Sequence, residues 1–355
     1  MAMTKWFDAL AKQGLEVQSA SDGAQVKGWL DTGCYALNWA ISGRFLQGYP
    51  LGHMVEIFGD PSTGKSFLVA RAIAQAQMQV GVALLDDTEG AYNLAWMRNL
   101  GVDTDSLGYA NSHTVKDHLQ VTTAFIKAYI TLQRQRKKLG PGLLACDSLA
   151  QLTTEHELEV GLERRDMTKA AELKSFFRQI TGQLHPLPIV HISTNHTIAN
   201  IGDMFQKRTT SGGGGPKFQS SVRVDLRTTS KLIKKGTTTE YLGVWCRAVI
   251  DKNRLAPPWK EVRLAIPFYQ PISRASGLIS ALISLGIFEA RGQFLRYQGK
   301  NIGRAYADKK ENALRQDELG EEILDRIPEL LEEVDEWLAQ HTPRLIGSDT
   351  ILEDE

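Results

Sequence analysis

The fold of this chain is decided by one stretch, Gly59-Asp60-Pro61-Ser62-Thr63-Gly64-Lys65-Ser66. It matches the phosphate-binding pattern G-x-x-x-x-G-K-S/T at every fixed position, with a buried strand predicted at 54–58 and a helix at 66–78. The glycines let backbone N–H groups converge on phosphate oxygens at a helix N-terminus, where the helix dipole also favours anions. The stretch is therefore predicted to bind a nucleoside triphosphate, with Lys65 on the β- and γ-phosphates and the Ser66 hydroxyl on Mg²⁺.

The composition predicts a soluble, cytoplasmic protein. With 355 residues the chain can bury a large core and is expected to hold one main domain with smaller additions. Cys34, Cys146 and Cys246 lie far apart without a C-x-x-C pair, so neither zinc nor a disulfide framework is indicated. No apolar run approaches about 18 residues and the N-terminus lacks a signal-like segment. No membrane association is therefore predicted, and the expected location is the cytoplasm, that of a host cell if a phage encodes the chain.

The neutral net charge hides an asymmetry along the chain. From residue 311 onward there are 15 acidic residues against three arginines, a net charge of −12, so the first 310 residues carry +12. A basic body with an acidic tail is typical of proteins that meet nucleic acid and regulate access to it. The segment 321–340 also fits a solvated amphipathic helix, and the two interpretations are compatible.

Short apolar strands alternate with helices from about residue 50 onward. Strands are predicted at 54–58, 82–85, 143–146 and 189–193, and helices at 66–78, 93–100, 116–138 and 169–184. This alternation predicts an α/β fold with a mostly parallel sheet covered by helices on both faces. Three β-rich segments, 222–228, 241–251 and 261–266, are predicted to extend the sheet in antiparallel fashion.

Four regions are predicted along the chain. Residues 1–30 hold a short helix, 4–14, and a polar linker, and this helix is expected to pack on a neighbouring subunit or back on its own domain. Residues 31–268 form the main α/β core. Residues 269–340 form a small α/β region that ends in one acidic helix, 319–340, and residues 341–355 form an acidic tail.

Carboxylates follow two of the predicted strands. Asp86, Asp87 and Glu89 end the strand 82–85, and Asp147 ends the strand 143–146. Ligands bind at the carboxyl edge of an α/β sheet, so these groups are expected beside the phosphate loop. A carboxylate after the first of these strands can orient and polarise an attacking water, and Asp147 can support Mg²⁺. Acidic residues after a strand are also common in plain loops.

Two further segments carry groups suited to nucleic acid. After the strand 189–193, Asn195 and His196 lead into the segment 197–218, whose four glycines at 212–215 are expected to forbid regular structure. A polar residue at this strand end can sense the γ-phosphate and order the loop. The segment combines cations with apolar side chains able to enter base steps, namely Lys207, Arg208 and Lys217 with Ile201, Met204 and Phe205, beside Gly212 and Gly213. A basic loop that opens the helix 169–184 is a second candidate contact, with Arg164, Arg165, Met167 and Lys169, although by itself it is nothing more than a charged surface loop.

Taken together, these residues resemble the RecA family of recombinases, most closely its phage UvsX-type members. The resemblance covers about 31–297. It rests on the phosphate loop, Glu89, Leu100-Gly-Val-Asp103, Asp147-Ser148, Asp166-Met-Thr-Lys-Ala-Ala, Asn195-His196-Thr197, the glycines before Lys217-Phe218 and Asp251-Lys252-Asn253-Arg254, in the family's order. The Asn195-His196-Thr197 form is phage-like, because bacterial members usually have Gln at the position of His196. Residues beyond about 300 lie outside the resemblance.

The resemblance implies a RecA-like core and a role for each matched residue. It makes Glu89 the catalytic base, His196 the link from the γ-phosphate to a second DNA loop that contains 201–205, and 164–167 part of a first DNA loop. Lys252 and Arg254 would act on the nucleotide of the adjacent subunit. Trp96 stands where the family has an aromatic residue beside adenine, though a core position fits it too. Asp86 and Asp87 make the stretch before Glu89 more acidic than usual, so either can share the water or Mg²⁺ role.

The sequence thus predicts an ATP-dependent recombinase that forms a helical filament on single-stranded DNA, pairs it with a homologous duplex and exchanges strands. ATP and Mg²⁺ are the expected cofactors. A single-strand-binding protein and a loader or mediator are further expected partners, and the tail is expected to compete with DNA for the basic body. Two alternatives stay open, a ring helicase or ATPase on the same core and a weakly hydrolysing paralogue that joins or caps filaments. Intact Lys65, Ser66 and Glu89 argue against the paralogue.

Overall fold

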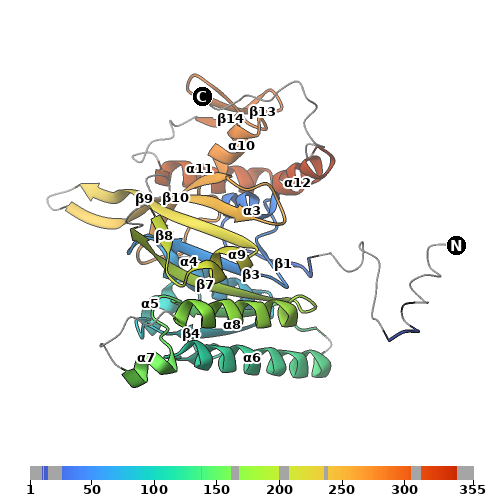
Figure 1. Ribbon diagram of the computed structural model, residues 1–355. Coiled ribbons are helices and arrows are strands. Elements are labelled where there is room, and N and C mark those ends of the chain that lie inside the picture. Colours follow the sequence, from blue (N-terminus) through green and yellow to red (C-terminus); the bar gives the residue numbers. More distant parts are fainter. Residues whose placement is uncertain are drawn as a thin grey trace, which may run out of the picture.

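The computed structural model describes residues 10, 12–14, 26–136, 138–160, 168–199, 208–235, 239–304 and 313–341, and within them a nine-stranded sheet forms the centre of the molecule (Figure 1). The strands follow the order β11-β10-β9-β3-β7-β6-β4-β5, with β8 paired to β7 off this path. Their bounds are β3 Met54–Gly59, β4 Val82–Asp87, β5 Gly108–Ala110, β6 Gly142–Asp147, β7 Ile189–Ala199, β8 Arg208–Thr210, β9 Val222–Lys235, β10 Thr239–Asn253 and β11 Glu261–Pro267.

The middle of the sheet is parallel, which confirms the prediction from the alternating pattern. β3 pairs in parallel with β7 and β9, and β6 pairs in parallel with β4 and β7. Because these strands run the same way, their carboxyl ends share one edge of the sheet. Gly59 lies opposite His196 in this register, and Asp87 lies opposite Asp147. The polar strand ends are thereby brought beside the phosphate loop.

The four predicted helices are present, with ends that differ by a few residues. They are α4 (Lys65–Met78), α5 (Leu94–Asn99), α6 (Val115–Gln135) and α8 (Thr168–Leu184). A capping box fixes the start of α6, because the Thr114 hydroxyl accepts from the Asp117 backbone N–H and the Asp117 carboxylate accepts from that of Thr114.

Two hydrophobic clusters lie on opposite faces of the sheet. Leu143 and Ala145 of β6 belong to the cluster that contains α4, whereas Leu144 and Cys146 belong to the cluster that contains α6 and α8. Successive side chains of a strand point to opposite faces. Helices therefore cover both faces of the sheet, and Figure 1 shows α6 and α8 side by side on one of them. The predicted α/β architecture is confirmed.

The three later β-rich segments form the predicted antiparallel extension. β10 pairs antiparallel with both β9 and β11. β9 itself runs parallel to β3, so it joins the extension to the parallel core.

The C-terminal region contains two acidic helices where the sequence predicts one. After α10 (Leu278–Ser284) and a three-stranded sheet of β12 (Glu289–Arg291), β13 (Phe294–Tyr297) and β14 (Lys300–Arg304) come α11 (Ala313–Arg326) and α12 (Leu330–His341). The prediction of a continuous helix over 319–340 is wrong because Pro328 has no backbone N–H and disfavours helical backbone at the residue before it. Asp335 of α12 accepts the backbone N–H groups of Phe45 at 2.7 Å and Leu46 at 3.0 Å, which docks α12 on the core.

Several short elements carried no clear sequence signal. They are β1 (Trp29–Leu30), β2 (Tyr49–Pro50), α3 (Tyr35–Ser42), α7 (Glu155–Val160) and α9 (Gly214–Gln219). The predicted N-terminal helix, 4–14, and the acidic tail lie almost wholly outside the described residues, so both stay predictions. Among the helices that the structure describes, none combines the length and the apolar character needed to cross a membrane.

Candidate active site

The phosphate loop joins β3 to α4 where only small residues fit. A Cβ at Gly59 would lie 2.3 Å from the carbonyl oxygen of Leu226. Gly64 has a φ of +96°, and a Cβ there would lie 2.7 Å from Cδ1 of Ile266. The glycines of the motif are thus required by close approach and by backbone conformation, in the place that the sequence predicts.

Lys65 is held inside this loop. Its Nζ donates to the carbonyl oxygens of Gly59 at 3.1 Å and Asp60 at 2.9 Å. Burial lowers the pKa of Lys65, and the negative charges of Asp147, Glu89 and Asp60 oppose that shift. If phosphate oxygens replaced these carbonyl oxygens, the acceptor as well as the donor would be ionised, and the hydrogen bonds of Lys65 would be stronger.

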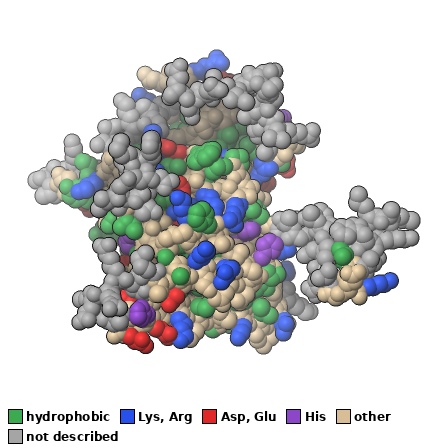
Figure 2. All heavy atoms as spheres, in the orientation of Figure 1, with side chains coloured by type: hydrophobic (Ala, Val, Ile, Leu, Met, Phe, Trp, Pro, Cys, Tyr) green, Lys and Arg blue, Asp and Glu red, His purple; other side chains and the backbone are tan. Residues whose placement is uncertain are grey.

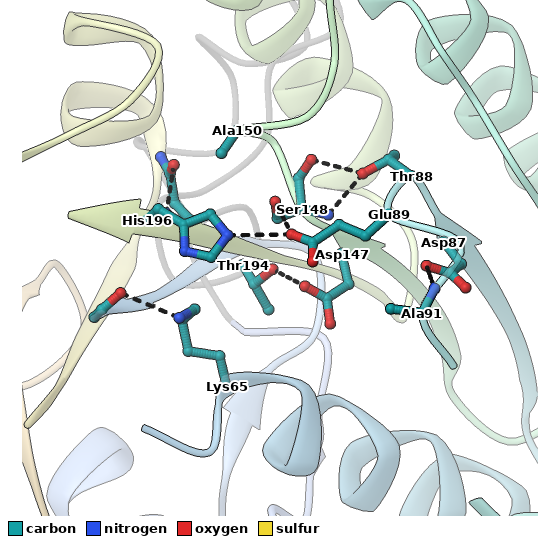
Figure 3. A network of polar contacts seen from close by, with 12 residues as sticks. Lys65, Asp87, Thr88, Glu89, Ala91, Asp147, Ser148, Ala150, Thr194 and His196 are labelled. Carbon is teal, nitrogen blue, oxygen red and sulfur yellow. Dashed lines mark hydrogen bonds and ion pairs between the residues drawn. The ribbon is translucent and has the colours of Figure 1, made fainter. Parts of the chain in front are cut away.

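A pocket of about 390 Å³ lies in front of the loop. Its lining includes most of the predicted nucleotide-site residues, namely Pro61, Ser62, Gly64, Lys65, Ser66, Glu89, Trp96, Asp147 and His196. Figure 3 shows Glu89, Asp147 and His196 grouped together, with Lys65 extending toward them from the start of α4. The structure therefore brings the predicted phosphate-binding and water-activating side chains into one pocket at the predicted sheet edge.

Glu89 is the centre of a small hydrogen-bonded group (Figure 3). Its Oε1 accepts the Ser148 hydroxyl at 2.7 Å and lies 3.1 Å from Nε2 of His196. Burial raises the pKa of Glu89, but the hydrogen bonds from Ser148 and His196 and the positive charge of Lys65 outweigh it, so the pKa is lowered. Glu89 is consequently ionised at neutral pH, which is the state that a general base requires.

Asp147 is fixed by two hydroxyl groups. Its Oδ1 accepts the Thr194 hydroxyl, and its Oδ2 accepts the Tyr92 hydroxyl at 2.8 Å. Each carboxylate oxygen still has a second lone pair, and Ser66 lines the same pocket. Hard oxygen donors of this kind suit Mg²⁺, which is usually held by one or two protein groups and several waters. Ser66 and Asp147 therefore fit the predicted Mg²⁺ site, and no cluster of three or more His, Cys, Asp or Glu occurs among the described residues to suggest another metal.

Asp86 has a structural role and not the predicted share in water or Mg²⁺ binding. It is fully buried and accepts from Nδ1 of His118 at 2.6 Å and from the Ser112 backbone N–H at 2.8 Å. Asp87 accepts the backbone N–H groups of Ala91 at 3.3 Å and Tyr92 at 3.2 Å, so it shapes the loop after Glu89. The geometry leaves Glu89 as the carboxylate of this stretch that faces His196.

Trp96 occupies both of the positions considered for it, a place against the hydrophobic core and a place in the wall of the pocket. It is half-buried on the hydrophobic core, and its indole N–H donates to the carbonyl of Phe268 at 3.0 Å. It also lines the pocket in front of the loop and an adjoining space of about 370 Å³ with Tyr92 and Asn93. The aromatic wall is therefore present, and its contact with a base stays a prediction.

Lys252 and Arg254 do not line this pocket but hold the end of α9. The Lys252 ammonium donates to the carbonyls of Lys217 at 3.0 Å and Phe218 at 2.7 Å, and Arg254 donates to that of Phe218 at 2.6 Å. Cations at the C-terminal end of a helix are favoured by its dipole. Burial, followed by the positive charges of Arg254 and Arg223, lowers the pKa of Lys252 to about 8. The pair thus bridges β10 and α9, and its action on an adjacent subunit stays a prediction.

The expectation that the four glycines forbid regular structure is wrong for Gly214 and Gly215, which open α9. A Cβ at Gly215 would lie 2.9 Å from the backbone nitrogen of Lys174 in α8, so the glycine permits close packing of the two helices. Gly212 and Gly213, with φ of +86° and +65°, form the left-handed turn before α9. Their contact with DNA is untested.

Most predicted DNA contacts lie outside the described residues. These are Arg164, Arg165, Met167, Ile201, Met204, Phe205 and Lys207, and for Arg208 only the backbone is described. The Lys169 ammonium donates to the Ala150 carbonyl at 2.6 Å, which anchors the segment after Asp147. Phe218, beside the predicted contact Lys217, is 65% exposed. Figure 2 shows Lys, Arg and hydrophobic side chains together in the middle of the face that it presents.

Sequence reasoning missed the hydroxyl groups that position the site. Ser148, Thr194 and Tyr92 bond Glu89 or Asp147, and the Thr197 hydroxyl bonds the Asp60 carboxylate. Three of them adjoin predicted residues in sequence, which is a usable signal. Tyr92 carried none, because its role depends on how the loop after β4 folds back toward β6.

A parallel sheet with a glycine loop between β3 and α4, and with carboxylates at the neighbouring strand ends, defines the phosphate-loop class of α/β proteins. The family model described as RecA N-terminal domain matches residues 10–273. The chain belongs to the RecA family.

Individual relatives agree with this assignment. The chain is 33% identical over 310 residues to "Protein RecA" of Mycobacterium avium (strain 104), a match that covers 85% of this chain and 82% of that protein. It is 31% identical over 309 residues to "Protein RecA" of Helicobacter pylori (strain P12), covering 84% and 83%. It is 32% identical over 302 residues to "Protein RecA" of Bacteroides thetaiotaomicron, covering 83% and 85%. These names do not address the closer kinship to phage UvsX-type members, which stays a prediction.

Proposed function

We propose that this chain is an ATP-dependent recombinase that forms a filament on single-stranded DNA and catalyses homologous pairing and strand exchange. The observation that carries the proposal is the group of Glu89, Ser148 and His196 beside the phosphate loop. One side chain of this group is an ionised carboxylate, the state that a base requires, and another stands at the start of the segment proposed to bind DNA. Nucleotide hydrolysis and DNA binding would therefore share a hydrogen bond.

Hydrolysis of ATP is assigned to the pocket in front of the loop. Lys65 would bind the β- and γ-phosphates, and Glu89 would orient and deprotonate the attacking water. Mg²⁺, held by Ser66 and through Asp147, would neutralise charge on the phosphates when bound. Trp96 would pack against the base. Because Lys252 and Arg254 lie outside this pocket, the proposal has them complete the site of the adjacent subunit, so hydrolysis should be slow without the filament.

DNA binding would depend on the γ-phosphate through His196. In the structure the His196 ring contacts Glu89. With ATP bound, His196 would also contact the γ-phosphate, and this contact would order the segment after β7 for DNA binding. The cations of the body would bind phosphates without reading sequence, since base pairing supplies recognition. In this scheme the protein works in the cytoplasm, with a single-strand-binding protein and a loader or mediator as further partners.

The direct test is an ATPase assay with and without single-stranded DNA, on the wild-type chain and on Glu89→Gln and Lys65→Ala. The wild-type rate should rise strongly with DNA. Glu89→Gln should lose turnover by a factor of about 100 or more, because an amide is no base. It should still bind DNA with ATP present, because the amide oxygen of glutamine can still accept hydrogen bonds from Ser148 and His196. Lys65→Ala should lose both turnover and ATP-dependent DNA binding, because the nucleotide phosphates are no longer bound.

A wild-type rate that is indifferent to DNA would contradict the proposal and favour the filament-associated paralogue. Electron microscopy with single-stranded DNA and a non-hydrolysable ATP analogue separates the other alternative. The proposal expects helical filaments, whereas closed rings would point to a helicase-like ATPase.

A further inference from the structure

Arg223 of β9 is a buried cation where four strands meet. Its Nε donates to Oε2 of Glu56 at 2.6 Å, and its Nη1 donates to Oδ2 of Asp251 at 2.6 Å. Its Nη2 donates to the Thr210 hydroxyl at 3.3 Å, and its guanidinium lies 4.3 Å from the centre of the Phe58 ring. One side chain therefore contacts β3, β8 and β10 from its position on β9.

One branch of these contacts leads to the nucleotide pocket. Glu56 lies on β3, three residues before the phosphate loop, and its Oε1 accepts from Nδ2 of Asn195 at 2.8 Å. The same amide donates to the Ser211 carbonyl at 2.8 Å, and Oδ1 of Asn195 accepts the backbone N–H of His196 at 2.9 Å. The branch thus fixes the backbone of His196, whose ring contacts Glu89.

The other branch leads to the two cations proposed to act on the adjacent subunit. In the β9–β10 ladder Ile250 pairs with Val224 and Lys252 pairs with Arg223, so Asp251 is the extra residue of a bulge. Bulges next to active sites redirect side chains, and here the bulge lets Asp251 reach Arg223 beside Lys252. Lys252 in turn holds the end of α9.

Stability alone does not account for this arrangement. A buried ion pair gains little over well-packed apolar residues, because both charges lose their hydration. Arg223 reaches Glu56, Asp251 and Thr210 through three different nitrogens, Nε, Nη1 and Nη2, a spread of donors that a guanidinium offers and a single ammonium does not. What the arrangement does fix is the relative position of β3, β7, β8 and β10.

We propose that Arg223 is a positioning residue that couples the two nucleotide-facing surfaces of one subunit, with His196 on the pocket side and Lys252 with Arg254 on the side of the neighbour. This inference rests on the proposed function of those three residues. A shift of His196 toward a bound γ-phosphate would move Asn195 and Glu56, and Arg223 would pass the change to the bulge at Asp251. Nucleotide state would thereby pass from one subunit to the next.

The test compares Arg223→Lys with Arg227→Lys in the full-length chain. Arg227 is a matched control because it lies on the same strand and pairs only with Asp225 of that strand, at 2.6 Å, among the described residues. Lysine keeps the charge but has its donors on one nitrogen, so it cannot reproduce the separate contacts of Nε, Nη1 and Nη2. Two measurements are made on each variant, the ratio of single-stranded DNA affinity with a non-hydrolysable ATP analogue to that with ADP, and the Hill coefficient of the DNA-dependent ATPase in ATP.

Arg223→Lys is expected to reduce the affinity ratio by about tenfold and to bring the Hill coefficient toward 1, while binding of a fluorescent ATP analogue is retained. Arg227→Lys should match the wild type in both measurements. An Arg223→Lys protein with wild-type ratio and cooperativity would overturn the inference alone. A wild-type chain with no difference between the two nucleotides would overturn the proposed function as well.

Asp251→Asn covers the case in which Arg223→Lys fails to fold. The Asp251 side chain is 44% exposed, so its replacement leaves the buried pair of Arg223 and Glu56 in place. It is expected to lower the affinity ratio in the same direction, and an unchanged ratio would count against the inference.

Discussion

At the scale of single residues, Glu89 and Asp147 differ in which of their carboxylate oxygens already accept hydrogen bonds from the protein. Both hydrogen bonds to Glu89 go to Oε1, and among the described residues none reaches Oε2. One carboxylate oxygen is therefore positioned by the protein while the other keeps its lone pairs for a water. Asp147 differs, because Thr194 and Tyr92 occupy one lone pair on each oxygen. This difference is consistent with the proposed roles, Glu89 as a base and Asp147 as a group that holds metal-bound water.

Lys252 gives a prediction about pH at this scale. Burial and the nearby arginines lower its pKa to about 8, so its charge is lost as the pH rises through that value. If Lys252 acts on a neighbouring triphosphate, the DNA-dependent ATPase rate should fall on the basic side with a midpoint near pH 8. Lys252→Arg should keep its rate through that range, because the arginine pKa lies above about 12. Rate profiles of the two proteins from about pH 6.5 to 9.5 make the comparison.

Unfolding driven by the titration of Lys252 itself cannot imitate this result. The pKa of Lys252 is lower in the folded protein than the ordinary value of 10.5, so above about pH 8 the unfolded chain binds more protons. Linkage then makes the contribution of this group to stability increase with pH across that window. If the rate falls at basic pH in Lys252→Arg as it does in the wild type, the titration of Lys252 is not the cause.

At the scale of elements, the sequence predicts strands and helices well where one local pattern decides them. Short apolar strands between helices are typical of a parallel sheet covered on both faces, and residues at their carboxyl ends then lie along one edge. That is why Lys65, Glu89, Asp147 and His196 could be placed together before the structure. Hydroxyl partners such as Tyr92 could not, because the contact joins elements far apart in the chain.

α9 shows where local reasoning failed. Four glycines favour a loop by propensity, since glycine is unfavourable inside a helix. Their actual role is set by α8, whose backbone comes too close to Gly215 for any side chain. The break between α11 and α12 differs, because Pro328 was visible in the sequence and predicts an interruption by itself.

Gly215 supplies the prediction at this scale. Gly215→Val should push α9 away from α8, because the new Cβ would lie 2.9 Å from a backbone atom that cannot move aside. We expect a loss of about 1–3 kcal/mol of unfolding free energy, together with weaker DNA binding, since α9 also anchors Lys252. Denaturant unfolding and DNA titration measure the two effects.

Gly214→Ala is the matched control. A Cβ at Gly214 would meet only the ring of the exposed Phe218, at 3.0 Å, and that side chain can turn away. This variant should keep wild-type stability. If Gly215→Val is equally stable, close packing is not the reason for the glycine.

At the scale of the whole molecule, the C-terminal region is joined to the core through buried polar contacts. Asp317 of α11 is 5% exposed and bonds the Ser276 hydroxyl and the Gly277 backbone N–H before α10. Ser276 in turn accepts the backbone N–H of Ala265 in β11 at 2.9 Å. These contacts hold α11 against the edge of the large sheet, so the charge on Asp317 affects how the two parts stay together.

Asp317 therefore makes stability depend on pH. Burial raises its pKa to about 7, and the charges of Glu321 and Glu318 add to the shift against the bonds from Ser276 and Gly277. The ordinary value is 3.8, so between that value and about pH 7 the folded protein holds a proton that the unfolded chain releases. Stability from this group is full at the acidic end of that window and is lost as the pH rises through about 7.

Asp317→Asn, which stays neutral and still accepts both hydrogen bonds, should be more stable than the wild type at pH 8. Its stability should also change less with pH between pH 5 and 8. Melting temperatures across that range test this, with Glu322→Gln as control, because Glu322 is exposed on the same helix and is not among the charges that shift the pKa of Asp317. Parallel profiles for Asp317→Asn and the wild type would show that the carboxyl is ionised in the folded protein throughout, and that the junction tolerates its charge.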